Sequence, residues 1–309
     1  MYETFYGLQE PPFHVTADPA FLFPSQQHRE ALDHLTYGIR QRLGFIAVTG
    51  EVGCGKTTVI KALLAQLPDS VRTSLLLNPT LSDLQLLEAI VQDFGLPWLQ
   101  REEAAAPRPS GQPARKTRAA LMAALNRFLL EQQAQGRTAV LIIDEAQTLA
   151  TRTLEQIRLV SNLETPKDKL LQIILVGQPE LDDTLSDPRL RPLRQRIAIR
   201  CRLQPLAAGE VGAYIAHRLR VAGAVEGRPA FTPEAVALIA RYSGGLPRTI
   251  NHICENALLA GFIRETMTID ETLVRRAIDT VDGAAGQLTE ALGESDHGRL
   301  AESAIPLPR

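Results

Sequence analysis

The chain has 309 residues, of which 45% are hydrophobic, so it can bury a full core in one large or two modest domains. A formal net charge of −2 gives no global positive field of the kind that marks many nucleic-acid-binding proteins, although a local basic patch stays open. Three cysteines without metal-ligand spacing, no leader-like N-terminus and no run near the roughly 18 apolar residues of a membrane span favour a cytoplasmic protein.

The first 24 residues are rich in aromatic residues and prolines. An isolated extended arm could not bury such rings, so we expect them to pack on the domain that follows, as core filling or, less simply, beside an adenine base. Ser25 then has the character of an N-cap, and residues 28–40 repeat apolar positions at helical spacing. A helix is therefore expected directly before the first strand.

The most informative stretch is G-x-x-x-x-G-K-T at residues 50–57, between an apolar strand at 44–49 and a helical pattern at 57–67. In that context the pattern predicts a phosphate-binding loop, in which backbone N–H groups surround a polyphosphate at a helix N-terminus. Lys56 would reach the β- and γ-phosphates, and the Thr57 hydroxyl would hold Mg²⁺. Cys54 is interpreted as a small residue tolerated among glycines, the alternative being an oxidisable thiol within the loop. The expected nucleotide-binding residues are Gly50, Glu51, Val52, Gly53, Cys54, Gly55, Lys56, Thr57 and Thr58.

Further along the chain, residues 71–77 are typical of a second strand and residues 84–94 of a helix. Residues 101–116 shift to Ala, Pro, Gly, Glu and Arg, which predicts a mobile surface loop. Helical periodicity resumes at residues 118–133.

A buried-type strand at residues 138–143 ends on Asp144 and Glu145. At the carboxyl edge of a parallel strand, Asp144 would bind Mg²⁺ through water and Glu145 would polarise the attacking water. After a helix at 152–164, the next strand, 171–176, is followed by Gln178. Gln178 would sense the γ-phosphate or position the water, the alternative being a simple strand-ending turn.

Residues 189–202 are dense in arginine. Three interpretations compete: a catalytic arginine that reaches a neighbouring subunit's nucleotide, a nucleic-acid-binding patch, or a solvated basic face. The first is favoured because NTPases of this kind often need a cation that stabilises the transition state in trans.

After residue 206 we expect helices only, at 210–222, 233–242, 248–264 and 271–281. Arg248 begins the third of these, where an arginine can reach a bound nucleotide. Residues 283–309 are rich in Gly, Ala, Ser, Glu and Pro, and we expect them to be disordered. The expected organisation is an N-terminal arm plus α/β domain at 1–206, a helical lid at 207–281, and a tail at 282–309.

The phosphate loop, the strand ending in Asp-Glu, the polar strand end, the arginine-rich segment and the helical lid together resemble the AAA+ ATPases. This resemblance implies an α/β P-loop module with a parallel sheet flanked by helices and a C-terminal all-helical lid. It also implies bound ATP and Mg²⁺, Gln178 as sensor 1 and Arg248 as sensor 2. Arg196 would be the arginine finger of a homo-oligomer, in preference to Arg191 or Arg194.

The segments GFIAVTGEVGCGKTT, LIIDEAQTL, LVGQPEL and YSGGLPRTINHICENALL, with the aromatic N-terminus, are similar to the ExeA or general secretion pathway protein A type. That resemblance spans nearly all of residues 1–281. Secretion members of the type carry a membrane span and a peptidoglycan-binding region after the ATPase, where this sequence shows a short polar tail. Related ATPases serve exosortase-linked export, and the similar TniB/TnsC group works on DNA.

Three functions follow as hypotheses. The first is a cytoplasmic ATPase, peripheral to the inner membrane through its partners, that drives or regulates assembly of a cell-envelope export system. The second is a DNA-binding switch of the transposition type, which depends on the arginine cluster. The third is a nucleotide-gated scaffold that binds ATP and hardly hydrolyses it.

Overall fold

The computed structural model describes residues 1–77, 81–96, 117–165, 168–225 and 227–282. The chain divides into two compact units. An α/β unit spans Ala17–Gln204, and a helical unit combines Met1–Thr16 with the chain from Pro205 onward. None of the helices in the described ranges has the length and apolarity that crossing a bilayer would require.

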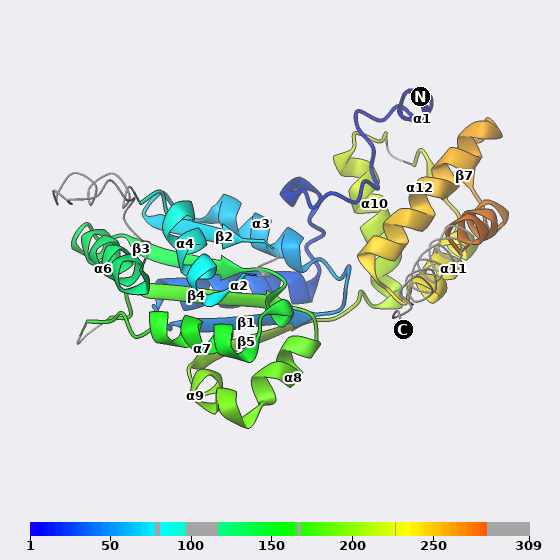
Figure 1. Ribbon diagram of the computed structural model, residues 1–309. Helices are drawn as coiled ribbons and strands as arrows, with labels where there is room; N and C mark the ends of the chain where they lie inside the picture. The colour runs from blue at the N-terminus through cyan, green and yellow to red at the C-terminus, as the bar shows by residue number, and fades with distance from the viewer. Residues whose placement is uncertain (78–80, 97–116, 166–167, 226, 283–309) are drawn as a thin grey trace, which may run out of the picture. The chain divides into compact units, whose positions relative to one another are not determined.

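The α/β unit is organised on one five-stranded sheet whose strands are all parallel (Figure 1). Its strand order is β2-β3-β4-β1-β5. Every residue of β1 and β4, two of the three inner strands, is buried, as expected for parallel strands covered on both faces. The strands are β1 (Phe45–Gly50), β2 (Val71–Leu76), β3 (Thr138–Ile143), β4 (Leu171–Gly177) and β5 (Ile197–Leu203).

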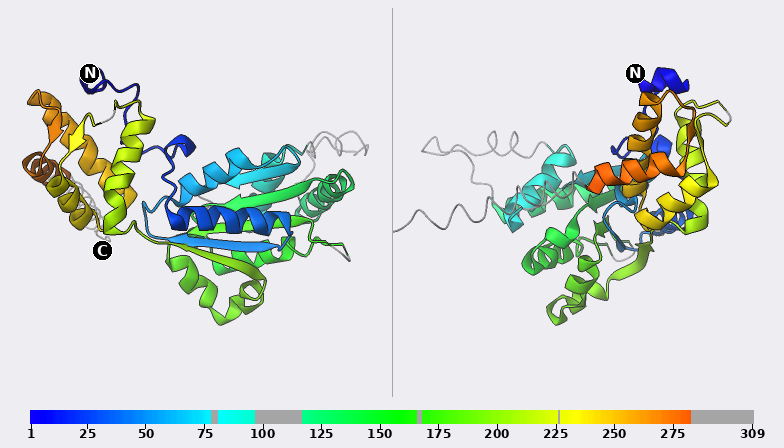
Figure 2. Two further views of the ribbon diagram at one scale, coloured as in Figure 1. Left: turned by 180° about the vertical axis from the view of Figure 1, so that it is seen from behind. Right: turned by 90° about the vertical axis from the view of Figure 1, so that its right-hand side faces the viewer.

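Helices cover both faces of this sheet, and α2 and α7 lie on opposite faces (Figures 1 and 2). The α7 face holds a core of alternate strand residues, among them Leu141 and Ile173, packed against leucines and isoleucines of the helices. The helices on that face are α4 (Asp83–Asp93), α6 (Arg118–Ala134), α7 (Thr151–Val160), α8 (Glu180–Ser186) and α9 (Arg191–Arg194). On the other face, α2 (Gln26–Arg40) packs beside α3 (Lys56–Gln66). Three short 3-10 turns complete this unit: η1 (Pro19–Phe21), η2 (Ala146–Thr148) and η3 (Pro188–Leu190).

The helical unit is built on α12, which packs against α1 and α11. Two two-residue strands also pair in parallel here, although only helices were expected after residue 206. Such strands are too short to show a period in the sequence. The elements are α1 (Tyr2–Tyr6), η4 (Ala208–Glu210), α10 (Val211–Val221), β6 (Ala230–Phe231), α11 (Pro233–Ser243), α12 (Pro247–Ile263), β7 (Thr268–Ile269) and a helix at 271–282.

The first sixteen residues differ from the expected organisation, which placed them with the α/β domain. Their aromatic rings pack on α12 instead: the Phe5 and Phe262 ring centroids lie 5.5 Å apart, and the Tyr6 hydroxyl donates to the Leu258 carbonyl at 3.0 Å. The rings of Tyr2, Tyr6 and Phe13 are buried as expected, and Phe5 is partly buried. Phe13 lies against Phe231 of β6, with ring centroids 6.2 Å apart, so the covering surface comes from late in the sequence.

The expected α/β fold with a parallel, helix-flanked sheet is confirmed. Strand β5 was not expected, because its sequence was interpreted only as an arginine-rich segment. The expected loop at 101–116 and the tail at 283–309 lie outside the described residues.

Candidate functional site

The phosphate loop joins β1 to α3, and its glycines are required by geometry. A Cβ on Gly50 would lie 2.6 Å from the carbonyl oxygen of Leu203, so only glycine fits there. Gly55, with φ of 99°, is the N-cap of α3 and has no side chain to accept the N–H groups of the first helical turn. Those N–H groups therefore suit an anion, which is the chemistry that the sequence predicts here.

His28 supports the loop from α2. Its Nε2 lies 3.3 Å from the carbonyl oxygen of Cys54, and its Nδ1 lies 2.6 Å from the Ser25 hydroxyl. Because a carbonyl oxygen only accepts, Nε2 carries the hydrogen in the neutral ring and Nδ1 accepts from Ser25. The Cys54 side chain is fully buried, and burial raises the pKa of its thiol. This residue is therefore a packing group, as the sequence indicated.

Lys56 extends across the loop. Its buried Nζ donates to the carbonyl oxygens of Gly50 at 2.7 Å and Glu51 at 3.0 Å. Among the described residues, no carboxylate forms an ion pair with this ammonium group. A buried cation held only by neutral carbonyls favours a bound anion, and a polyphosphate meets that need.

Thr57 and Asp144 bring the two nucleotide motifs together. The Thr57 hydroxyl donates to Asp144 Oδ2 at 3.0 Å, which joins the first turn of α3 to the carboxyl end of β3. A hydroxyl and a carboxylate are ligands that suit Mg²⁺, which usually keeps several of its waters. In the described ranges, no group of three or more His, Cys, Asp or Glu side chains could form another kind of metal site.

Glu145 lies next to Asp144 in a left-handed backbone conformation, with φ of 54°. Its Oε2 accepts hydrogen bonds from the side-chain amides of Gln147 at 2.5 Å and Gln178 at 3.2 Å. The structure thus brings together Glu145 and Gln178, which follow β3 and β4, two neighbouring strands. Gln147 was not predicted, because its place depends on how those two strand ends meet.

Arg196 precedes β5, and its side chain is held within its own chain. Its Nη1 donates to the Ser161 hydroxyl at 2.9 Å and to Asn162 Oδ1 at 2.6 Å, both at the end of α7. Arg191 and Arg194, the alternatives for the finger, are exposed in α9. The three arginines therefore differ in how firmly the fold fixes them.

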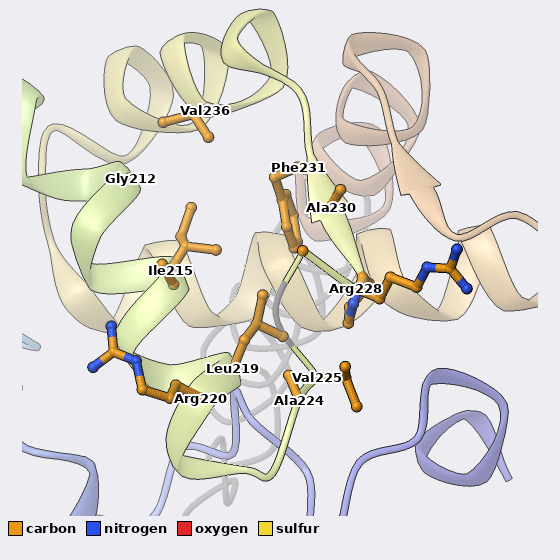
Figure 3. Close-up of a pocket in the computed structure, with 13 residues that line it drawn as sticks. Gly212, Ile215, Leu219, Arg220, Ala224, Val225, Arg228, Ala230, Phe231 and Val236 are labelled. Carbon is orange, nitrogen blue, oxygen red and sulfur yellow. The ribbon is translucent and has the colours of Figure 1, made fainter.

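Arg248 lies exposed in the first turn of α12, in the helical unit, so its predicted role at the nucleotide stays a prediction. That unit also contains a pocket of about 650 Å³ between α10, β6 and α11. The pocket is lined largely by apolar side chains such as Ile215, Leu219 and Phe231, while Arg220 and Arg228 extend away from them (Figure 3). This lining does not suit a polyphosphate.

Comparison with known proteins agrees with this geometry. A family model described as an AAA domain matches residues 39–185. The chain is 46% identical over 264 residues to general secretion pathway protein A of Aeromonas hydrophila, a match that covers 85% of this chain and 45% of that protein. The chain thus spans about half the length of the curated relative.

Solved structures show the same fold at low identity. The ORC2 protein of Aeropyrum pernix, in its ADPNP-ADP complexes, matches with a TM-score of 0.63 at 16% identity, over 88% of this chain and 71% of that one. ORC of Drosophila bound to DNA matches with a TM-score of 0.62 at 18% identity, over 90% of this chain and 65% of that one. The RuvB Holliday junction branch migration motor of Thermotoga maritima matches with a TM-score of 0.54 at 18% identity, over 83% of this chain and 69% of that one. With its phosphate loop and its Asp-Glu strand end, the chain belongs to the AAA+ P-loop ATPases of the general secretion pathway protein A type.

Proposed function

We propose that this chain binds ATP with Mg²⁺ and hydrolyses it at the carboxyl ends of β1, β3 and β4. The observation that carries the proposal is the contact between Thr57 and Asp144, at 3.0 Å, with Glu145 next in sequence. The loop N–H groups and Lys56 would hold the phosphates, and Thr57 and Asp144 would hold the metal. Bound Mg²⁺ neutralises charge on the phosphate oxygens.

In the proposed reaction, Glu145 takes a proton from the attacking water. The water oxygen bonds to the γ-phosphorus while the bond from that phosphorus to the bridging oxygen breaks, and the electron pair stays on ADP. Gln178 supports this role, because its amide contacts the Glu145 carboxylate. The proton then passes to solvent.

We further propose that the active form is a homo-oligomer in which Arg196 of one subunit stabilises the transition state on its neighbour. The resemblance carries this choice, and in the structure Arg196 Nη1 donates to Ser161 and Asn162 of its own chain. Arg248 of the helical unit is proposed as a second contact to the nucleotide.

The proposed cellular role is to drive or regulate assembly of a cell-envelope export or secretion system, at the cytoplasmic side of the inner membrane through partner proteins. This role is supported by the name of the 46% identical relative.

A DNA-linked role is the second candidate, and one feature of the edge strand favours it. Ala198, Arg200 and Arg202 alternate on the exposed side of β5, and Arg191 and Arg194 are exposed shortly before it. Exposed arginines on one segment suit phosphate contacts. A scaffold that binds ATP without hydrolysis is the remaining alternative.

The deciding experiment measures steady-state ATP turnover against protein concentration, with and without duplex DNA at low salt. We expect turnover per chain to rise with protein concentration and to be the same with and without DNA. Strong stimulation by DNA that disappears as salt rises would favour the second candidate, because phosphate contacts weaken with salt. ATP binding without turnover at any protein concentration would favour the scaffold that binds ATP without hydrolysing it.

A further inference from the structure

Gln147 occupies a place between the two strand ends that carry the site. It lies in η2, the 3-10 turn that follows Glu145. Its Nε2 donates to Glu145 Oε2 at 2.5 Å, and its Oε1 accepts from the backbone N–H of Gln178 at 3.0 Å. One side-chain amide thus joins the carboxylate after β3 to the backbone after β4.

The hydrogen bonds to Glu145 are unequal between its two oxygens. Both amide donors, Gln147 and Gln178, reach Oε2. In the described part of the chain no hydrogen bond reaches Oε1. The carboxylate is therefore oriented through one oxygen, and the other keeps its lone pairs for a proton.

The backbone around Glu145 is fixed as well. Its N–H donates to Asp144 Oδ1 at 2.9 Å, and its carbonyl oxygen accepts from the Thr148 hydroxyl at 2.8 Å. A non-glycine residue in the left-handed region persists only where neighbours enforce it. With the backbone held, rotation of the side chain is the remaining freedom, and Gln147 restricts it.

The fold reserves space for the Gln147 amide. A Cβ added to Gly177, the last residue of β4, would lie 2.8 Å from Gln147 Oε1 and 2.9 Å from Leu181 Cδ2. Glycine at this strand end therefore gives room for the bridge. The same site would be crowded by any larger residue.

We propose that Gln147 is a positioning residue for ATP hydrolysis. It holds the Glu145 carboxylate by Oε2, so that Oε1 accepts the proton of the attacking water, and it ties that carboxylate to Gln178. This inference rests on the proposed ATPase function. Gln147 acts through Glu145, so its loss slows the chemical step and leaves nucleotide binding in place.

The test compares Gln147→Ala, Glu145→Gln and the double variant in the full chain. Single-turnover hydrolysis of ATP with Mg²⁺ gives the rate, and titration with mant-ATP gives the affinity. We expect Gln147→Ala to lower the rate about tenfold or more with affinity within about twofold of wild type. In the Glu145→Gln background, the Gln147→Ala change should not lower the hydrolysis rate further. Gln135→Ala, which changes an exposed glutamine after α6, is the matched control.

Gly177→Ala provides an independent variant, because the added methyl group displaces the Gln147 amide without deleting it. Its rate loss should match that of Gln147→Ala, and the two losses should not add. If Gly177→Ala does not fold, the cycle with Glu145→Gln still decides.

Three outcomes overturn the inference: a wild-type rate in Gln147→Ala, a loss confined to affinity, or a further proportional loss in the Glu145→Gln background. Absence of turnover in the wild-type oligomer would overturn the proposed function and this inference together. Normal wild-type turnover with an unaffected Gln147→Ala variant would overturn this inference alone.

Discussion

The Thr57 hydroxyl donates to a carboxylate oxygen of Asp144 at 3.0 Å. Thr57 lies in the first turn of α3, the helix after β1, and Asp144 follows β3. Strand β4 lies between β1 and β3 in the sheet. The two groups proposed to bind the metal thus come from distant parts of the sequence and are adjacent in the fold. Because they contact each other, the effects of changing them are expected to be coupled.

The first prediction concerns the metal. Thr57→Ala and Asp144→Asn should each raise the Mg²⁺ concentration needed for half-maximal ATP turnover by about tenfold or more, since either change removes one ligand contact. The measurement is a Mg²⁺ titration at saturating ATP. Thr4→Ala, which changes an exposed threonine of α1 in the helical unit, is the control. Unchanged Mg²⁺ dependence in both ligand variants would contradict the assigned metal site.

The second prediction concerns Glu145. Glu145→Gln keeps the size of the side chain and removes the base, so ATP should still bind while turnover falls by about a hundredfold or more. Fluorescent-nucleotide titration and phosphate release are the two measurements. A variant that turns over ATP normally would exclude Glu145 as the base.

The third prediction concerns Arg196. Arg196→Ala should lose turnover with ATP affinity retained, and mixing it with Lys56→Ala should restore part of the activity. Mixed assemblies contain interfaces where an intact Lys56 site faces an intact Arg196 from the neighbour. Phosphate release across mixing ratios is the measurement.

Two checks accompany the mixing experiment. Arg189→Ala changes an exposed arginine of the same segment that pairs with Asp187, so it should behave as wild type. Arg196 also binds Ser161 and Asn162, so the melting temperature of Arg196→Ala must be compared with wild type. No recovery at any ratio, in a folded variant, would count against a finger acting in trans.

Much of the candidate site could be located from the sequence because its motifs are local. The phosphate loop is a continuous stretch whose glycines and lysine have fixed roles, and Asp144 and Glu145 directly follow an apolar run. Such runs mark strands buried on both faces, which β3 and β4 are. The position of Gln178 near Asp144 and Glu145 could be predicted from the rule that the carboxyl ends of parallel strands meet at one edge of the sheet.

The remainder depended on contacts that no local pattern encodes. Strand β5 lies at the sheet edge, so Arg200 and Arg202 on its exposed side obscured the inward alternation of its apolar residues. Predicting the contacts of Gln147 would have required the register of β3 against β4. Predicting the contact of His28 would have required knowledge of how α2 packs beneath the loop. Placing the first sixteen residues would have required knowledge of the surface on α12 against which Phe5 packs.

The fourth prediction concerns the cysteines, all three of which are buried and unpaired. Burial raises the pKa of the Cys201 thiol to about 11 and the pKa of Cys54 and Cys254 above their ordinary values. Raised pKa values mean less thiolate, so at pH 8 the Cys201 thiolate population should be far below that of a free cysteine. Ellman's reagent should label the native protein slowly and all three thiols after unfolding. Rapid labelling of Cys54 in the native protein would contradict its role as a packing group.

The last prediction concerns His28, which holds the phosphate loop through the carbonyl oxygen of Cys54 at 3.3 Å. A Cβ on Gly55 would lie 3.1 Å from the same ring, so the imidazole also fills the space beneath the loop. His28→Ala removes a donor from a buried carbonyl and leaves a cavity, which should loosen the loop and weaken ATP binding by about tenfold. The nucleotide Kd measures this effect, with the exposed His252→Ala as control. Turnover at saturating ATP should change less than affinity, because His28 acts on the phosphate loop while Gln147 and Gln178 hold Glu145. A variant with wild-type affinity would show that the loop holds its shape without the histidine, and that the glycines alone define it.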